Sequence, residues 1–189
     1  MSTTTRIAKR ELRKQLKRAL ASIPNESVTH QRSKKTVPPN QLDQAVQPRQ
    51  IMDMLELNDL QDYEGLELDA WGIPTPSEAS LNERKNCFGG YGKSEDLDVE
   101  EADAEDELDL IITPGLGFDR NLGRTGRGMG FYDYFFQRCG KSQRRGKVPW
   151  KVGLALNEQV LPADQTVPMD ETDQRIDALI LGDGSVLRR

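Results

Sequence analysis

Residues 108–133 read LDLIITPGLGFDRNLGRTGRGMGFYD, and they contain the most informative local pattern of the chain. The apolar run at 108–113 is rich in isoleucine and leucine and ends at a Pro-Gly pair, which predicts a short buried strand. A glycine-rich loop follows, and the aromatic run that begins at Phe131 predicts a helix. The order strand, loop, helix favours an α/β fold.

The loop between the predicted strand and helix has the composition of an anion-binding cradle. Its glycines alternate with other residues, at Gly126, Gly128 and Gly130. Backbone without side chains can turn several N–H groups toward one point. Arg124 and Arg127 add guanidinium groups suited to phosphate oxygens, and the N-terminus of the helix adds positive potential. The loop therefore predicts a phosphate site.

The spacing alone does not identify the ligand. No Gly-Lys-Ser/Thr follows the loop and the glycines fall at alternate positions, so neither a Walker A loop nor a dinucleotide fingerprint is present. A glycine-rich hairpin with solvated arginines fits the three glycines equally well. Asp133 favours the phosphate reading, because a carboxylate next to a phosphate needs a divalent cation between them. Nucleotide plus magnesium is the simplest interpretation.

Four blocks of sequence also occur in a set order: KRELR at 9–13, WGIPTP at 71–76, PGLGFD at 114–119 with RTGRGMGFYD at 124–133, and VGLAL at 152–156 with Gln159 and PMDETD at 168–173. Together they resemble the 5-formyltetrahydrofolate cyclo-ligase family, also called methenyltetrahydrofolate synthetase. The resemblance covers roughly residues 6–23 and 50–181 and is weak over 77–107.

The resemblance implies a three-layer α/β/α sandwich with a mostly parallel sheet. The implied reaction is the ATP- and Mg²⁺-dependent closure of 5-formyltetrahydrofolate to 5,10-methenyltetrahydrofolate, with release of ADP and phosphate. Transfer of the γ-phosphate to the formyl oxygen would convert a poor leaving group into phosphate. Such a protein needs to position its substrates and neutralise charge more than it needs acid–base residues.

The resemblance also assigns roles to individual residues. Nucleotide binding is implied for Lys9, Arg10, Arg13, Arg124, Gly126, Arg127, Gly128, Met129, Gly130, Phe131 and Tyr132. Folate binding is implied for Trp71, Arg127, Gly128, Met129, Gly130 and Phe131. The candidate catalytic residues are Arg127 and Tyr132, and the candidate Mg²⁺ ligands are Asp133 and Asp173. Met129 replaces a lysine usual in the family, so we expect weaker phosphate binding there.

Ordinary structural roles compete with several of these assignments. Lys9 and Arg13 lie four residues apart and could form a solvated helix face. Trp71 could be a core or lid aromatic, and Tyr132 could simply pack in the core. Asp173 could be a turn acid at the start of the last strand, which we predict at residues 175–181.

The first 23 residues predict an amphipathic helix that is capped by a threonine near its start and ends before Pro24. Arginine-rich amphipathic segments also occur in mitochondrial transit peptides. We favour a structural helix, because the resemblance includes it in the mature enzyme. A cytoplasmic location is therefore expected, with a mitochondrial one as the alternative.

Two regions depart from a regular pattern. Residues 25–50 contain three prolines and no apolar periodicity, which predicts a linker. The resemblance implies a strand–helix–strand unit there, of on the order of 30 residues, that includes a folate-binding glutamate, and this unit is missing. Residues 78–107 predict a mobile loop that runs into a disordered acidic insertion. We expect a segment from 51 to 57 to form a strand and 59–63 a short helix.

Composition limits the class of protein. With 189 residues, of which 35% are hydrophobic and 30% charged, the chain predicts one globular domain over residues 1–189. Cys87 and Cys139 form no C-x-x-C pair, which favours a reducing compartment. No apolar run has membrane-spanning length. His30 is the single histidine, so a histidine nucleophile or zinc site is not expected.

The expected partners are therefore small molecules, the folate substrate and ATP, bound by a monomer. The acidic run argues against nucleic acid, and no membrane is expected. Two other functions remain open. One is a shortened homologue that binds nucleotide without folate turnover. The other is a non-enzymatic interaction protein that uses the basic helix and the acidic run.

Overall fold

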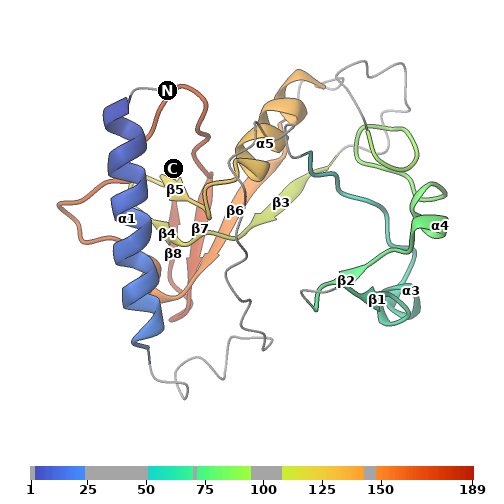
Figure 1. Cartoon of the computed structure of the whole chain (residues 1–189), viewed down its shortest axis with the longest axis horizontal. Helices are drawn as coiled ribbons and strands as arrows, with labels where there is room; N and C mark the ends of the chain where they lie inside the picture. Colours follow the sequence, from blue (N-terminus) through green and yellow to red (C-terminus); the bar gives the residue numbers. More distant parts are fainter. Residues whose placement is uncertain (1–2, 24–50, 70–71, 95–107, 143–147) are drawn as a thin grey trace.

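The structure is a computed structural model that describes residues 3–23, 51–69, 72–94, 108–142 and 148–189 (Figure 1). Several predictions made above lie outside the described residues. They concern the linker and missing unit near 25–50, His30, Trp71 and the acidic run at 95–107.

The N-terminal segment forms the helix α1 (Thr3–Ala21), as its amphipathic pattern predicts. Leu16 is buried against Leu161 and Val167, with Leu12 beside it. The helix ends where Ser22 donates its backbone N–H to the carbonyls of Arg18 and Ala19. The apolar side of α1 thus packs the helix against the segment that contains Leu161 and Val167.

The main sheet contains β3 (Leu110–Thr113), β6 (Trp150–Ala155), β7 (Ala178–Leu181) and β8 (Val186–Arg188), in that order. The first two pairings are parallel, and β8 runs antiparallel to β7. The α/β class is therefore confirmed, with a mixed sheet. The strands predicted at 108–113 and 175–181 are present as β3 and β7, the latter starting at Ala178. Strand β8 was not predicted, because its short sequence has little apolar pattern.

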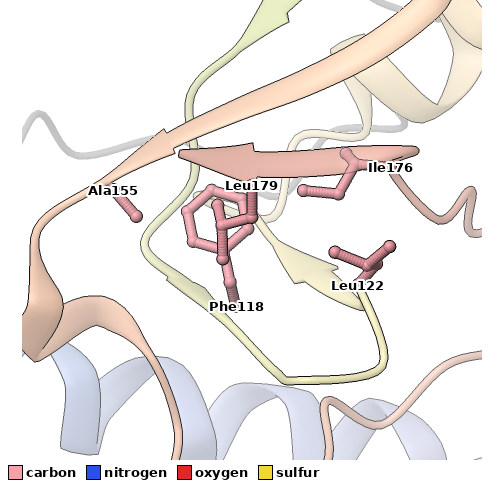
Figure 2. Close-up of a cluster of buried hydrophobic side chains, with 5 residues drawn as sticks. All are labelled: Phe118, Leu122, Ala155, Ile176 and Leu179. Atoms are coloured by element: carbon pink, nitrogen blue, oxygen red, sulfur yellow. The ribbon is translucent and has the colours of Figure 1, made fainter. Parts of the chain in front are cut away.

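One face of the sheet is covered by two elements. Helix α5 (Phe131–Lys141) packs Phe135 and Phe136 against Ile111 of β3. The hairpin of β4 (Gly117–Phe118) and β5 (Arg124–Thr125) inserts the ring of Phe118 beside Leu179 (Figure 2). Both elements come from the loop and helix that the sequence placed directly after β3.

Close packing at this face depends on a glycine. A Cβ at Gly153 would lie 2.8 Å from the Cδ1 atoms of Ile176 and Leu179 and 2.9 Å from a ring carbon of Phe118. Such distances are far below van der Waals contact. Only glycine allows the Phe118 ring to come this close to β6, so Gly153 sets how closely the hairpin packs on the sheet.

The opposite face is bare in the part of the chain that the structure describes. Of the apolar side chains on this face, Val152 and Ala178 are buried. The others are exposed and come from all four strands: Leu110, Ile112, Trp150, Leu154, Ile180 and Val186. No described element covers them. The described residues therefore form one covered face and one open face rather than the three expected layers.

Residues 51–94 form a smaller region with α3 (Leu60–Glu64), α4 (Glu78–Leu81) and the hairpin of β1 (Glu67–Leu68) and β2 (Pro74–Thr75) (Figure 1). The helix expected near 59–63 is confirmed. The strand expected at 51–57 is reduced to one bridge, Leu55 with Asn86. In the stretch predicted as a mobile loop, Asn86 and Phe88 are buried.

A buried arginine joins this region to α5. The Arg138 guanidinium donates to Asp53 Oδ1 at 2.7 Å and to Ser94 Oγ at 2.7 Å, and it lies 4.2 Å from the centre of the Phe88 ring. These partners satisfy the charge, which would otherwise be costly to bury.

None of the described helices has the length and apolar character that a membrane crossing requires.

Candidate functional site

The glycine-rich loop lies between β5 and α5 and adopts conformations that favour glycine. Gly128 and Gly130 have φ angles of 100° and 77°, in the left-handed region where other residues are strained. Gly130 is also the N-cap of α5, and no side chain in the described part of the protein caps that helix. The first backbone N–H groups of α5 therefore have no described side-chain partner, which favours an anion at this end of the helix.

Helix α1 lies over this loop through Arg13. The Arg13 Nε atom donates to the carbonyl of Gly126 at 3.1 Å. A Cβ on Gly128 would lie 3.2 Å from an Arg13 guanidinium nitrogen. The structure thus brings a cation from the first helix to the loop, 113 residues later in the chain. Arg13 therefore lies beside the loop, and the nucleotide-binding role that the resemblance implies for it stays a prediction.

Arg124, predicted to donate to phosphate oxygens, forms contacts within the protein itself. Its side chain is buried, and it donates to Asp133 Oδ2 at 2.9 Å and to the carbonyl of Pro114 at 3.3 Å. The guanidinium carbon also lies 5.4 Å from the centre of the Tyr132 ring. Arg124 therefore ties the start of the loop to the first turn of α5. It is also not the solvated arginine of a simple hairpin.

Burial, which the charge of Arg124 opposes, raises the pKa of Tyr132 above its ordinary value. The phenol is therefore neutral at physiological pH and can act as a hydrogen-bond donor rather than as a base. Its ring also packs beside Phe136. Both the predicted catalytic role and the alternative packing role thus have a physical basis.

Two further side chains fix the β4–β5 hairpin that precedes the loop, and neither was assigned a role from sequence. Gln159 donates to the carbonyl of Gly115 at 2.8 Å and accepts from the N–H of Leu156. Asp119 is fully buried and accepts backbone N–H bonds from Gly123 and Val167. The Asp-Arg-Asn-Leu-Gly sequence at 119–123 is a turn signal that could have indicated the first of these Asp119 bonds.

Lys9 anchors α1 to the segment that precedes β7. Its ammonium lies 2.6 Å from Asp170 Oδ2 and also forms an ion pair with Asp173. Burial alone would raise the pKa of Asp170, but hydrogen bonds from Lys9 and Thr172 hold that pKa well below its ordinary value. Helix α1 is thus fixed by the ion pairs of Lys9 as well as by the packing of Leu16.

The two candidate metal ligands lie in adjoining parts of the site. Asp133 Oδ1 accepts the backbone N–H of Gln174 at 3.2 Å, and Gln174 directly follows Asp173. Each carboxylate is paired with a cation, Asp133 with Arg124 and Asp173 with Lys9. Within the described ranges, no cluster of three or more histidine, cysteine or acidic side chains could hold a metal.

Most of the remaining predicted residues are exposed. Those that are exposed are Arg10, Arg127, Gly128, Met129 and Gly130. Phe131 is half-buried at the start of α5. The structure thus brings together three of the four sequence blocks. It does not place Trp71, which belongs to the remaining block at 71–76, because that residue lies outside the described ranges.

Comparison with known proteins gives one consistent answer. Residues 83–182 match the model of the 5-formyltetrahydrofolate cyclo-ligase family. The chain is 33% identical over 132 residues to 5-formyltetrahydrofolate cyclo-ligase of Mus musculus. The aligned residues cover 70% of this chain and 54% of the relative. It is 42% identical over 89 residues to that of Saccharomyces cerevisiae, which covers 47% of this chain and 39% of the relative.

A third relative is the mitochondrial 5-formyltetrahydrofolate cyclo-ligase of Arabidopsis thaliana, 34% identical over 115 residues, with 60% of this chain and 36% of the relative covered. The chain spans about half the length or less of these curated relatives. The family match includes the glycine-rich loop, α5 and both candidate metal ligands. This chain belongs to the 5-formyltetrahydrofolate cyclo-ligase family.

Proposed function

We propose that this chain closes 5-formyltetrahydrofolate to 5,10-methenyltetrahydrofolate in a reaction that uses ATP and Mg²⁺ and releases ADP and phosphate. The observation that carries the proposal is convergence. Segments around residues 9–13, 124–133 and 170–174 meet through the contacts of Lys9, Arg13 and Asp133. These segments are far apart in the sequence, and each belongs to a block of the family resemblance.

The residues present fit a nucleoside triphosphate. The uncapped N-terminus of α5 and the exposed Arg127 offer donors to phosphate oxygens. The buried hydroxyls of Thr113, at the end of β3, and of Thr125, directly before the loop, have no hydrogen-bond partner among the described residues. Such orphaned groups are rare in buried positions unless a ligand or water completes them. These two hydroxyls therefore have unused hydrogen-bonding capacity.

The donor set also fits a hard divalent cation. Asp133 and Asp173 supply carboxylate oxygens, the ligands that Mg²⁺ takes together with phosphate and water oxygens. A bound Mg²⁺ would neutralise charge on the transferring phosphoryl group. The chain itself holds Asp133 in place through Arg124 and the Gln174 N–H. The site is thus organised around the carboxylate rather than around a free arginine.

In this proposal, each remaining side chain has a limited task. Arg13, above Gly126 and Gly128, orients the polyphosphate, and Arg127 contacts the transferred phosphate from the rim. Tyr132, kept neutral by burial, donates a hydrogen bond to an oxygen of the reacting groups. None of them needs to form a covalent bond, because positioning and charge neutralisation dominate this kind of transfer.

The folate side of the site is proposed by extension from the same loop. Gly128, Met129, Gly130 and Phe131 would contact the substrate, with Trp71 from the neighbouring block. We further propose a monomeric single domain with the three-layer sandwich of the family, in which the third layer would lie on the bare face of the sheet. A cytoplasmic location fits this enzyme, with a mitochondrial one as the alternative, as in the Arabidopsis relative.

One observation favours a second candidate function, a homologue that binds nucleotide without turning over folate. The chain spans about half of its relatives, and one face of its sheet is open. A binding assay for ATP separates the two candidates when it is combined with a turnover assay.

The deciding experiment follows the absorbance of 5,10-methenyltetrahydrofolate after 5-formyltetrahydrofolate, ATP and Mg²⁺ are mixed with the purified chain. The proposal expects turnover that the Asp133→Asn variant loses. Asp164→Asn, an exposed acid in the loop before β7, removes the same charge and should retain activity. ATP binding without any turnover in the unmodified chain would reject the proposal in favour of the second candidate.

A further inference from the structure

Lys9 and Arg13 lie one turn apart on α1 but face different partners. Arg13 contacts the backbone of the glycine-rich loop at Gly126. The Lys9 side chain is 5% exposed and reaches two carboxylates, those of Asp170 and Asp173. Arg13 therefore lies beside the loop that we expect to bind phosphate, whereas Lys9 is paired with Asp173, a candidate metal ligand.

The oxygen that Lys9 contacts is the one a metal would need. Asp173 Oδ2 accepts both the Lys9 ammonium and the backbone N–H of Asp170. Mg²⁺ binds carboxylate oxygens directly and at short distance. Two cations at one carboxylate oxygen would repel each other strongly in a partly buried site. Lys9 and a divalent cation therefore compete for Asp173.

The other cation of the site cannot exchange in this way. Arg124 also donates to the Pro114 carbonyl, and its guanidinium lies against the rings of Tyr132 and Phe136. Lys9, by contrast, is a compact ammonium on a flexible stem, and among the described residues its only hydrogen bonds and ion pairs are those with the two carboxylates. Displacement from Asp173 would free Lys9 to move, while the pair of Arg124 and Asp133 stays fixed.

We propose that Lys9 is a displaceable counter-ion that Asp170 and Asp173 hold until a divalent cation takes its place at Asp173, and that the released ammonium then binds the polyphosphate. This inference rests on the proposed nucleotide and metal site. It predicts that cation and polyphosphate bind cooperatively, because each favours the state in which Lys9 has left Asp173.

The direct test is the reactivity of the Lys9 amine in the unmodified chain. Reductive methylation with formaldehyde and cyanoborohydride, read by peptide mass spectrometry, should be slow at Lys9 without ligands. Mn²⁺ alone should raise the rate at Lys9 by about fivefold or more, the lower end of usual coupling factors. Added tripolyphosphate should lower it again. Lys14, which is exposed on the same helix, is the internal control and should not respond.

A second measurement uses Mn²⁺ binding followed by electron paramagnetic resonance. Lys9→Met should bind Mn²⁺ alone about fivefold more tightly than the unmodified chain, because the competitor is gone. The same variant should bind Mn²⁺ with tripolyphosphate more weakly and with less cooperativity. Lys14→Met removes one charge from the same helix and should leave both affinities unchanged.

The outcomes separate this inference from the proposed function. If the unmodified chain binds Mn²⁺ and tripolyphosphate but Lys9 reactivity does not change, the counter-ion role is wrong and the site remains. Equal or weaker Mn²⁺ affinity in a folded Lys9→Met variant has the same meaning. If the unmodified chain binds neither probe, both the site and the role of Lys9 are wrong.

Discussion

The two faces of the main sheet have similar side chains but opposite environments. On β3, Ile111 is 1% exposed beneath α5, whereas its neighbour Ile112 is 47% exposed on the other side. On the inner strands, Leu179 is fully buried, while Trp150 is 59% exposed. Successive side chains of a strand point to opposite faces, so the difference comes from what covers each face and not from composition.

The covered face of the sheet also carries the candidate site. The hairpin of β4 and β5 and helix α5 pack on the covered face, and α1 reaches them through Leu16, which contacts the Gly117 position. Arg13, Arg124 and Asp133 belong to these elements. The candidate site is thus built on one side of the sheet. Sheets with parallel strands are usually covered on both sides, which makes the bare face the incomplete part of the described fold.

The largest expected effect contrasts one leucine from each face. Leu179→Ala should lower the free energy of unfolding by about 3 kcal/mol, because it leaves a cavity beside Phe118 and Ile176. Leu154→Ala, on the bare face, should cost about 0.5 kcal/mol, as exposed positions do. Urea denaturation of both variants measures the difference. Equal losses would mean that the bare face is covered in solution.

The second prediction tests how tightly the covered face is packed. Gly153→Ala should cost about 2 kcal/mol, since the added methyl group would overlap Ile176, Leu179 and Phe118. Gly140→Ala is the matched control in α5, where an added Cβ meets nothing within 4 Å. It should stabilise the chain by about 0.5 kcal/mol through helix propensity. The same sign for both changes in thermal melts would contradict the tight packing at β6.

The smallest expected effect concerns the ionic contacts that hold α1 on the covered side. The pKa of Asp170 in the folded chain lies below its ordinary value of 3.8, so the folded state binds fewer protons than the unfolded state. The contribution to stability is therefore complete above about pH 4 and is lost as the pH falls further. Melting temperatures between pH 6 and pH 3 should fall more steeply for the unmodified chain than for Lys9→Met.

The control for this pH series is Lys14→Met, which should follow the unmodified chain. The Asp62 carboxyl also has a pKa lowered by a hydrogen bond from Arg84, but it contributes equally in all three proteins. Parallel pH profiles for Lys9→Met and the unmodified chain would show that the Lys9 contacts do not stabilise the folded state.

Local sequence patterns predicted the elements that build the site. The amphipathic spacing of residues 3–21 gave α1, and the apolar run with its Pro-Gly stop gave β3. The aromatic run after Gly130 gave α5. These predictions were correct because periodicity, helix stops and glycine conformations act over a few residues. The hairpin around Asp119 and the short strand β8 were missed, because two- and three-residue strands have too few side chains to show a pattern.

The sequence by itself thus determined the family, the order of strand, loop and helix, and the glycines that the loop needs. Only the tertiary structure decided that Arg124 pairs with Asp133, that Lys9 pairs with Asp170 and Asp173, and that one sheet face is covered. Lys9 and Asp170 are 161 positions apart. A contact over that separation depends on how α1, the loop and β7 pack together, and local residue preferences do not encode it.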